Sequence, residues 1–157
     1  MSSKFSRLDF LRFSALGAST LFIPRALTAA EAPKKAKKGD VNDKINIGFI
    51  GLGQQAIHLV NGFLTIPEVR VIAGCDIYDI KRNRFVERVN KYYAEKGIKN
   101  KLDMYIKYED LLAREDIDAV VIATPDHWHA AIAIAACKAG KDVYLEKPLT
   151  FTVYEGQ

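Results

Sequence analysis

From residue 45 onward, short apolar segments of strand character alternate with longer segments of helical periodicity. Strands are expected at 45–51, 69–76, 103–108, 118–124 and 142–147. Helices are expected at about 55–65, 80–96 and 127–140, with a small helix around Leu111 and Leu112. Strands that alternate with helices at this spacing form a parallel sheet joined by right-handed crossovers. The pattern therefore predicts an α/β fold, a doubly wound parallel sheet of five strands.

The positive charge of the chain is concentrated before this pattern begins. The net charge is +4, but residues 1–44 hold nine Lys and Arg against four Asp and Glu, while residues 45–157 hold fourteen against fifteen. The folded part therefore has no basic excess with which to bind nucleic acid. A length of 157 residues and a hydrophobic content of 49% suit one globular domain preceded by a leader.

The first thirty residues have the layout of an export signal. A basic start is followed by an uncharged run at 13–24 and by small residues at 28–30. The run is shorter than the ~20 residues that a stable membrane-spanning helix needs. The stretch SRLDFLR is similar to the twin-arginine motif but has Leu8 in place of the second arginine, so twin-arginine export, ordinary secretion and an uncleaved anchor all stay open. We expect an exported, periplasmic protein, with residues 31–44 as a flexible linker.

The first expected strand runs into the sequence GLGQQA, with glycines at 51 and 53 and Ala56 at the third small position. Gly51 permits a tight turn, and Gly53 lets the backbone approach a diphosphate with no Cβ in the way. The amides of Gln54 and Gln55 would face the phosphates at the start of the following helix. Because a charge at a helix end contributes only ~0.3–1 kcal/mol, a dinucleotide needs a second contact.

Asp76 supplies this second contact. It lies twenty residues after Ala56, at the end of the second expected strand, where a carboxylate can bind both hydroxyls of the adenosine ribose. Strand, glycine loop, helix and acid together favour a dinucleotide-binding fold of the Rossmann type over an ordinary turn with an exposed Asp. The carboxylate would repel a 2′-phosphate, which favours NAD over NADP. Lys81, Arg82 and Arg84 lie near enough to weaken that preference.

The carboxyl ends of three expected strands carry the other candidate residues. Gly51, Thr124 and Lys147 follow the first, fourth and fifth strands, which are neighbours in a sheet of order 3-2-1-4-5. Pro125 keeps Thr124 extended, and Asp126 can cap the next helix. We therefore expect these residues to meet at one edge of the sheet.

His127 and His129 resemble a metal pair, but helical positions two apart point about 200° away from each other. A metal site is therefore disfavoured. Two interpretations stay open: one histidine lines the cofactor pocket, or a histidine is packed at the helix start. Cys75 and Cys137 lie in apolar strand and helix patterns without metal-ligand spacing, and both are expected to be buried thiols.

Lys147 leaves an apolar strand at the edge where the nicotinamide end of a cofactor would lie. A positive ring and partial desolvation both favour the neutral amine of a lysine, which can then transfer a proton. Pro148 keeps the backbone of Lys147 extended and so fixes where the side chain points. An exposed lysine paired with Glu146 at a strand end is equally compatible with the spacing.

Four stretches, GFIGLGQQA, CDIYDIKR, YEDLLAREDIDAVVIATPDHWHA and AGKDVYLEKPLT, resemble the N-terminal domain of the Gfo/Idh/MocA oxidoreductases, the family of glucose–fructose oxidoreductase and inositol dehydrogenase. The resemblance covers about residues 45–157, and Glu146-Lys147-Pro148 is the hallmark of the family. It implies that Lys147 binds substrate and transfers a proton beside the nicotinamide, that Asp76 holds the ribose, and that 124–129 flank the cofactor. The residues expected to bind the cofactor are Gly51, Gly53, Gln54, Gln55, Asp76, Arg82, Thr124, Pro125, His127, Glu146 and Lys147.

The resemblance also implies parts that this sequence does not contain. In the family a sixth strand follows, and a second domain carries the substrate pocket, most oligomer contacts and the acid and histidine that act with the lysine. We therefore expect residues 45–157 to be the incomplete cofactor half of a longer enzyme, with a homo-oligomer only when the missing domain is present. Alone, the chain is expected to bind NAD weakly, to oxidise no sugar and to be marginally stable because a sheet edge is exposed.

The implied function is hydride transfer between NAD and a sugar, a polyol or a derivative, with Lys147 handling the hydroxyl proton. One alternative is an NAD-dependent glycosidase of the same superfamily, although the resemblance implies an apolar residue at the lysine position of such relatives. A second alternative is a nucleotide-binding fragment without catalysis. No metal and no nucleic-acid partner are expected.

Overall fold

The structure, a computed structural model, describes residues 44–157. The expected export signal (1–30) and all but the last residue of the expected linker (31–44) lie outside the described residues. The strands in the described range are β1 (Ile45–Ile50), β2 (Val69–Cys75), β3 (Asp103–Tyr105), β4 (Ala119–Ile122) and β5 (Asp142–Leu145). The helices are α2 (Gln54–Leu64), α3 (Asp79–Glu95), α4 (Tyr108–Leu112) and α5 (His129–Lys138), with a 3-10 helix at Asp126–Trp128.

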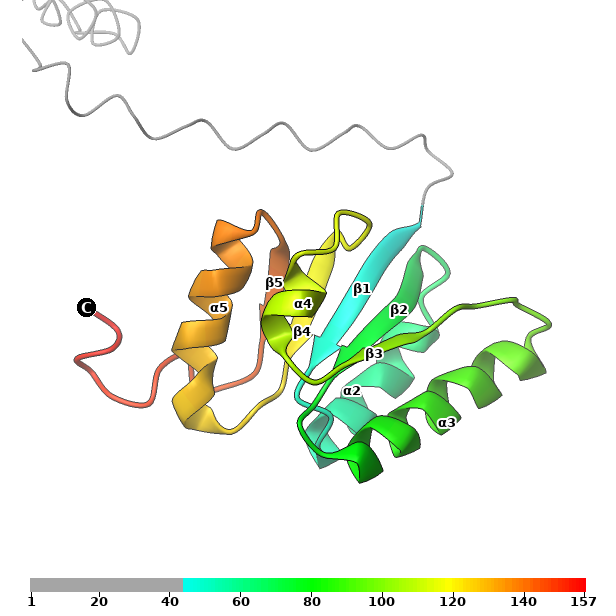
Figure 1. Ribbon diagram of the computed structural model, residues 1–157, viewed down its shortest axis with the longest axis horizontal. Helices are drawn as coiled ribbons and strands as arrows, with labels where there is room; N and C mark the ends of the chain where they lie inside the picture. Colours follow the sequence, from blue (N-terminus) through cyan, green and yellow to red (C-terminus); the bar gives the residue numbers. More distant parts are fainter. Residues whose placement is uncertain (1–43) are drawn as a thin grey trace, which may run out of the picture. The chain divides into compact units, whose positions relative to one another are not determined.

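The strands form one parallel sheet in the order β3-β2-β1-β4-β5, which confirms the predicted fold class and strand order. Helices α2 and α3 cover one face of the sheet, and α4 and α5 cover the other (Figure 1). The carboxyl ends of all five strands therefore lie at the same edge of the sheet.

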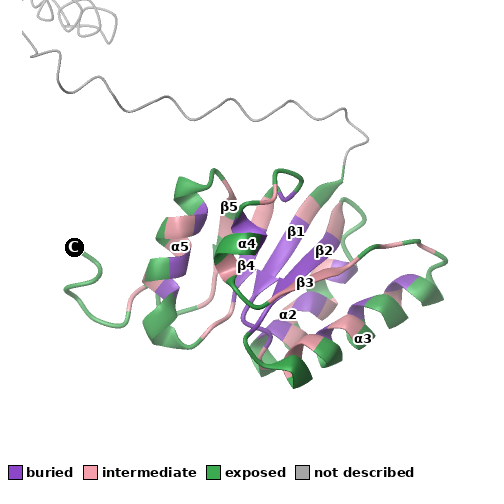
Figure 2. Ribbon diagram, viewed as in Figure 1, coloured by how far each residue is buried: buried purple, intermediate pink, exposed green. Residues whose placement is uncertain are grey.

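Alternation along the strands divides the core into two layers. In β1, Phe49 packs toward α2 and α3, whereas the next residue, Ile50, packs toward α4 and α5. Successive strand residues point to opposite faces, so a strand covered on both faces is apolar throughout. Figure 2 shows this burial as a continuous band along the central strands. Apolar burial on both faces holds the two helical layers to the sheet.

The two long helices that cover the first face bury residues at intervals of four. Helix α2 buries Ala56, Val60 and Leu64. In α3 the buried residues are Phe85, Val89 and Tyr93. Residues four apart lie on one side of a helix, so each helix offers a single apolar stripe to the sheet. The helices expected at about 55–65 and 80–96 are therefore each attached to the sheet by one buried stripe.

Helix α5 begins two residues later than the predicted start at residue 127. The chain first makes the 3-10 turn, in which the amide of Trp128 donates to the Pro125 carbonyl at 2.9 Å, and α5 begins only at His129. Asp126 lies inside this turn and makes no capping hydrogen bond, so the predicted cap was wrong. At the other end of α5, Gly140 follows the cap residue with a φ of 71°, the left-handed conformation in which helices commonly end.

The two cysteines differ in burial. Cys75 in β2 is buried, as expected. Cys137 is exposed, so its predicted burial was wrong. The core-facing residues of α5 are Ile132 and Ala136, and a helix turns by about 100° per residue, which carries position 137 away from the sheet. Among residues 44–157, no helix combines the length and the apolar character needed to cross a bilayer.

Candidate functional site

The glycine loop after β1 makes the turn that the sequence predicted. Gly51 has a φ of 83°, in the left-handed region that side chains disfavour, and its amide donates to the Cys75 carbonyl at 2.8 Å. A Cβ on Gly51 would lie 2.7 Å from both the amide nitrogen and the Cγ2 of Thr124. Close packing against the chain that follows β4 therefore requires glycine here, in addition to the turn.

Gly53 is the cap residue that precedes α2, and the space beside it is open. Its backbone is extended, and a Cβ built on it would meet no atom within 4 Å. Gln54 and Gln55, the first two residues of α2, are exposed. They also line a hollow of about 420 Å³ that runs along the side of α2 to Asn61. The first amides of a helix have no partner within the helix and carry its partial positive charge. A phosphate group can therefore approach the loop at this point.

Asp76, directly after β2, faces this loop with its carboxylate largely buried. Its side chain accepts hydrogen bonds from the amide of Leu52 at 2.8 Å and from the amide of Tyr78 at 3.0 Å. Lys81 Nζ lies 3.7 Å from the same oxygen that holds Leu52. Each carboxylate oxygen has two lone pairs, so Asp76 can hold the loop and still accept hydrogen bonds from ribose hydroxyls. The tie to Leu52 was not predicted from the sequence.

Arg82 and Arg84, the two arginines that follow Asp76, donate hydrogen bonds to backbone carbonyls. Arg82 donates to the Asp76 carbonyl and pairs with Asp79, while Arg84 donates to the Leu52 carbonyl at 3.0 Å. Both guanidinium groups are therefore engaged within the loops around the glycine turn. The expected contact of Arg82 with the cofactor stays a prediction. The cation next to the Asp76 carboxylate is Lys81, whose side chain is 36% exposed.

The ends of β4 and β5 meet the glycine loop at the same edge. The amide of Ala123 donates to the Ile50 carbonyl at 2.9 Å, and the amide of Glu146 donates to the Ile122 carbonyl at 3.0 Å. Across the loop, Gln55 Nε2 donates to Glu146 Oε1 at 3.0 Å. The structure thus brings together the predicted residues from three strand ends, and it links the glycine loop directly to the residue before Lys147.

Lys147 is exposed, and its peptide bond to Pro148 is cis. In the part of the chain that the structure describes, Lys147 forms no ion pair, and Glu146 bonds Gln55 instead. The alternative in which Lys147 pairs with Glu146 is therefore wrong, although the exposure that it assumed is correct. The role of Lys147 toward a cofactor or substrate stays a prediction.

The two histidines have different environments. His129 is 1% exposed, and its ring nitrogens contact the carbonyl oxygens of Pro148 and Thr124 at 2.6 and 2.9 Å. It is the packed histidine at the helix start that the sequence allowed. His127 is exposed, as is Pro125, and their contact with a cofactor stays a prediction. Within residues 44–157, no three His, Cys, Asp or Glu side chains gather as metal ligands would.

Cys75, which precedes Asp76 in sequence, has an unreactive form of its thiol at neutral pH. Burial, reinforced by the negative charge of Asp76, raises the pKa of the Cys75 thiol to about 12. The thiol therefore stays protonated at neutral pH and packs as a small apolar group.

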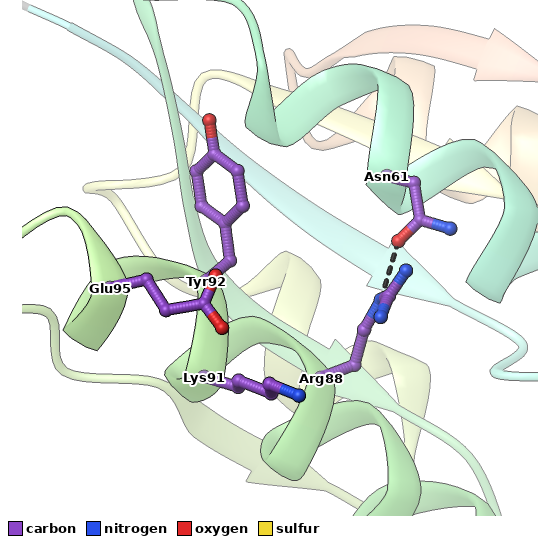
Figure 3. Close-up of a pocket in the computed structure, with 5 residues that line it drawn as sticks. All are labelled: Asn61, Arg88, Lys91, Tyr92 and Glu95. Carbon is purple, nitrogen blue, oxygen red and sulfur yellow. Dashed lines mark hydrogen bonds between the residues drawn. The ribbon is translucent and has the colours of Figure 1, made fainter.

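Another hollow, of about 310 Å³, lies between α2 and α3, away from the glycine loop (Figure 3). Arg88 Nε donates to Asn61 Oδ1 across it at 2.6 Å. Its other lining residues are Lys91, Tyr92 and Glu95, all from α3. None of the predicted site residues lines this hollow, so it does not belong to the candidate site.

The residues at the carboxyl edge fit a dinucleotide. Gly53 leaves open space beside the helix start. Among the described residues, Thr124 Oγ1 is a buried side-chain oxygen without a hydrogen-bond partner, at the point where β4 ends. Asp76 presents a carboxylate with unused lone pairs. Phosphate, hydroxyl and amide groups of a nucleotide can each find a matching partner here.

Comparison with known proteins agrees with this geometry. Residues 45–157 match the family model described as "Oxidoreductase family, NAD-binding Rossmann fold", GFO_IDH_MocA. A curated relative from Shewanella sp. (strain ANA-3), named glycosyl hydrolase family 109 protein 2, is 34% identical over 98% of this chain and 36% of the relative. The chain spans about a third of the length of the curated relatives that match nearly all of it.

Two solved structures show the same fold in proteins with described activities. The apo scyllo-inositol dehydrogenase from Lactobacillus casei is 25% identical, with a TM-score of 0.60 over 72% of this chain and 31% of that one. A 3-ketoreductase from Actinomadura kijaniata in complex with NADP is 29% identical, with a TM-score of 0.61 over 72% of this chain and 33% of that one. The second of these structures holds a nicotinamide cofactor, NADP.

Proposed function

Because the chain belongs to the Gfo/Idh/MocA oxidoreductase family, through the NAD-binding Rossmann fold of residues 45–157, we propose that it serves hydride transfer to or from a sugar, a polyol or a derivative. The observation that carries the proposal is the meeting of three features at one sheet edge. These features are the open glycine loop, the buried carboxylate of Asp76, and Lys147 after β5.

One end of this edge would bind the adenosine half of NAD(P). The amides of Gln54 and Gln55, at the start of α2, would donate to the diphosphate. Asp76 would accept hydrogen bonds from the ribose hydroxyls. Its charge repels a 2′-phosphate, which favours NAD, while Lys81 at 3.7 Å partly offsets the repulsion and leaves NADP as the weaker ligand.

The other end of the edge would serve the reaction. When bound, NAD(P) supplies a nicotinamide ring that accepts or donates a hydride. Lys147 would hold the substrate hydroxyl and move its proton, because its amine is the exposed basic group after β5. Glu146 would keep that strand end against α2 through its hydrogen bond with Gln55.

Similar proteins support a polyol or sugar substrate. One solved structure is that of a scyllo-inositol dehydrogenase, and another is that of a 3-ketoreductase in complex with NADP. Both names describe oxidation or reduction at a carbon that bears oxygen. This likeness favours a dehydrogenase or reductase acting on a hydroxyl or a ketone.

A second candidate function is NAD-dependent glycoside hydrolysis, because curated relatives from Shewanella carry the name glycosyl hydrolase family 109. The two functions differ in the fate of the hydride. A dehydrogenase accumulates NADH as it consumes a polyol, whereas the glycosidase returns the hydride within each cycle. Turnover of an aryl glycoside by the purified protein without accumulation of NADH would put the second function first.

The cofactor site is tested by titrating NAD and NADP against Asp76 variants. Asp76→Asn keeps an acceptor for the Leu52 amide but removes the charge, so we expect NAD affinity to fall roughly tenfold and the preference over NADP to narrow. Asp76→Ala also leaves the Leu52 amide without its acceptor, and we expect a larger loss of affinity. Affinities equal to that of the wild type would remove the ribose role of Asp76.

Glu87→Gln is the matched control for these variants. Glu87 is an exposed acid on α3, the helix that follows Asp76. Its loss changes the net charge by the same amount without touching the glycine loop. NAD affinity should therefore stay at the wild-type value, and an equal fall in this variant would reduce the Asp76 effect to one of overall charge.

We also propose that the protein is exported to the periplasm. The support is the sequence of residues 1–30, with a basic start, an uncharged run and small residues at 28–30. The expected result is a mature protein in the periplasmic fraction whose N-terminus, measured by mass spectrometry, begins near residue 31. An intact N-terminus on a protein found only in the cytoplasm would refute the proposal.

A further inference from the structure

The position of Lys147 depends on the residues on either side of it. On one side, the Glu146 amide donates to the Ile122 carbonyl and its carboxylate accepts from Gln55, both at 3.0 Å. On the other side, the Pro148 carbonyl contacts a ring nitrogen of His129 at 2.6 Å. Lys147 itself is exposed, so its direction is set by these two anchors rather than by packing.

The second anchor is the one that ties the end of the described chain to the sheet. After Pro148, the hydrogen bonds of the described residues are formed within 150–157: Thr150 and Glu155 bond the backbone of 151–152, and Gly156 bonds Val153. The large apolar side chains of this segment, such as Leu149 and Tyr154, are exposed. Within the described part of the chain, the segment after Lys147 is therefore tied to the domain by the hydrogen bond at Pro148.

The ring of His129 is buried between the loops that follow β4 and β5 and contacts a carbonyl oxygen of each. Its ring is 1% exposed at the start of α5, and the helix is fixed to the sheet by Ile132 and Ala136. Nδ1 contacts the Pro148 carbonyl, and Nε2 contacts the Thr124 carbonyl at 2.9 Å. A neutral imidazole donates to one of these oxygens, and a cationic imidazole donates to both. One rigid ring thus bridges the loops that follow β4 and β5.

We propose that His129 is a positioning residue for Lys147: the imidazole bridge between the Thr124 and Pro148 carbonyls fixes the backbone that presents the lysine amine to the cofactor. The proposal rests on the proposed function of Lys147. It goes further by assigning a role in that function to a histidine that touches neither cofactor nor substrate. A flexible Lys147 would lose the fixed geometry on which proton transfer depends.

Two substitutions separate the two arms of the bridge. An asparagine at 129 places its amide nitrogen near the position of Nδ1, and a glutamine places it near that of Nε2. His129→Asn should therefore keep the contact with Pro148, while His129→Gln should keep only the contact with Thr124. Both variants replace a buried ring by a buried amide, so a loss of packing affects them alike.

The first readout is the rate at which a trace of acetic anhydride acetylates the Lys147 amine. Peptide mass spectrometry measures this rate relative to that of Lys138, an exposed lysine on α5. Saturating NAD should slow the acetylation of Lys147 in the wild type and in His129→Asn, because the lysine is held beside the cofactor. In His129→Gln, NAD should give no such protection. Equal protection by NAD in all three proteins would overturn the proposal.

The second readout needs no cofactor. The amide of Glu146, which donates to the Ile122 carbonyl at 3.0 Å, is the bonded amide next to Lys147. Its hydrogen exchange should be roughly fivefold faster in His129→Gln than in the wild type, because the strand end opens more often once the Pro148 anchor is lost. In His129→Asn it should be unchanged. If NAD protects Lys147 in none of the proteins, the proposed function of Lys147 fails. Exchange then still decides whether His129 holds the chain after β5, and equal exchange in all three refutes that link.

A measurement on the wild type alone covers the case in which His129→Gln does not fold. A hydrogen bond between Nδ1 of His129 and the Pro148 carbonyl transmits a scalar coupling that is measurable by NMR. We expect this coupling in the free protein and in the NAD complex. Its absence from both would refute the bridge, whatever the behaviour of the variants.

Discussion

In residues 44–157, polar groups are paired within the protein at one end of the sheet and left partly unpaired at the other. At the end where the strands begin, Arg114 pairs with Asp103 at 2.9 Å and with Asp116 at 2.6 Å. Beside it, Lys141 Nζ donates to the carbonyls of Arg114 and Ile117. These charged groups are therefore matched within the protein, although Asp103, Arg114 and Asp116 also line a hollow of about 360 Å³.

At the end where the strands finish, polar groups are left open. Gly53 leaves free space at the helix start, Thr124 Oγ1 is buried without a partner among residues 44–157, and Lys147 is exposed. Buried polar atoms are usually paired, and an unpaired one calls for an explanation. One end of the sheet thus pairs its charged groups within the protein, and the other leaves polar groups available to a ligand. Substitutions at the two ends should therefore differ in how much they lower the free energy of unfolding.

The largest effect on stability should come from Gly51→Ala, because the binding end depends on a turn that glycine makes without strain and a residue with a side chain does not. The φ of 83° and the 2.7 Å approach to the Thr124 backbone together should lower the free energy of unfolding by about 2–4 kcal/mol. Urea denaturation measures the change. Gly62→Ala is the control: it lies in α2 with open space around it, and should raise stability by up to about 1 kcal/mol. A Gly51→Ala variant as stable as the wild type would contradict the account of this turn.

A smaller loss is expected from Arg114→Ala at the opposite end. The side chain of Arg114 is 18% exposed and joins two acids, so its removal should cost about 1–2 kcal/mol of unfolding free energy. Arg88→Ala, which removes a surface arginine bonded only to Asn61, should cost less than about 0.5 kcal/mol. Equal losses of unfolding free energy in the two variants would show that the pairing of Arg114 with two acids adds no more stability than a single surface hydrogen bond.

The same pair gives a pH dependence. The hydrogen bond from Arg114 lowers the pKa of the Asp116 carboxyl below its ordinary value. A lowered pKa in the folded state contributes stability that is present above the unfolded pKa of about 4 and is lost as the pH falls through the folded value. The stability difference between wild type and Arg114→Ala should therefore be constant near neutral pH and shrink below about pH 4. The change should be small, because Asp116 is 57% exposed.

The smallest effect on stability should follow Lys147→Ala at the binding end. The side chain is exposed and forms no ion pair in the described part of the chain, so the free energy of unfolding should stay within about 0.5 kcal/mol of the wild type. Thermal or urea unfolding checks this value. A loss above about 1 kcal/mol would show that Lys147 supports the fold and would weaken the contrast between the two ends.

Much of the fold and part of the site were predictable from the sequence. The alternation of apolar segments predicted the strands, the dinucleotide-binding pattern predicted their order in the sheet, and the spacing from Gly51 to Asp76 placed a glycine turn opposite an acid. These features depend on short-range periodicity and on strand ends that all point the same way. The predicted burial of Cys137 was wrong because apolar composition along α5 does not show which side faces the sheet.

The sequence by itself determined the kinds of element, their order along the chain, and the residue types at the ends of the strands. This is possible because periodicity and backbone preference act over a few neighbouring residues. Only the tertiary structure decided the partners: Asp76 with the Leu52 amide, Gln55 with Glu146, and His129 with Pro148. Gln55 and Glu146 lie 91 residues apart. A contact across that separation depends on how two strands and two helices pack together, and no local pattern records that packing.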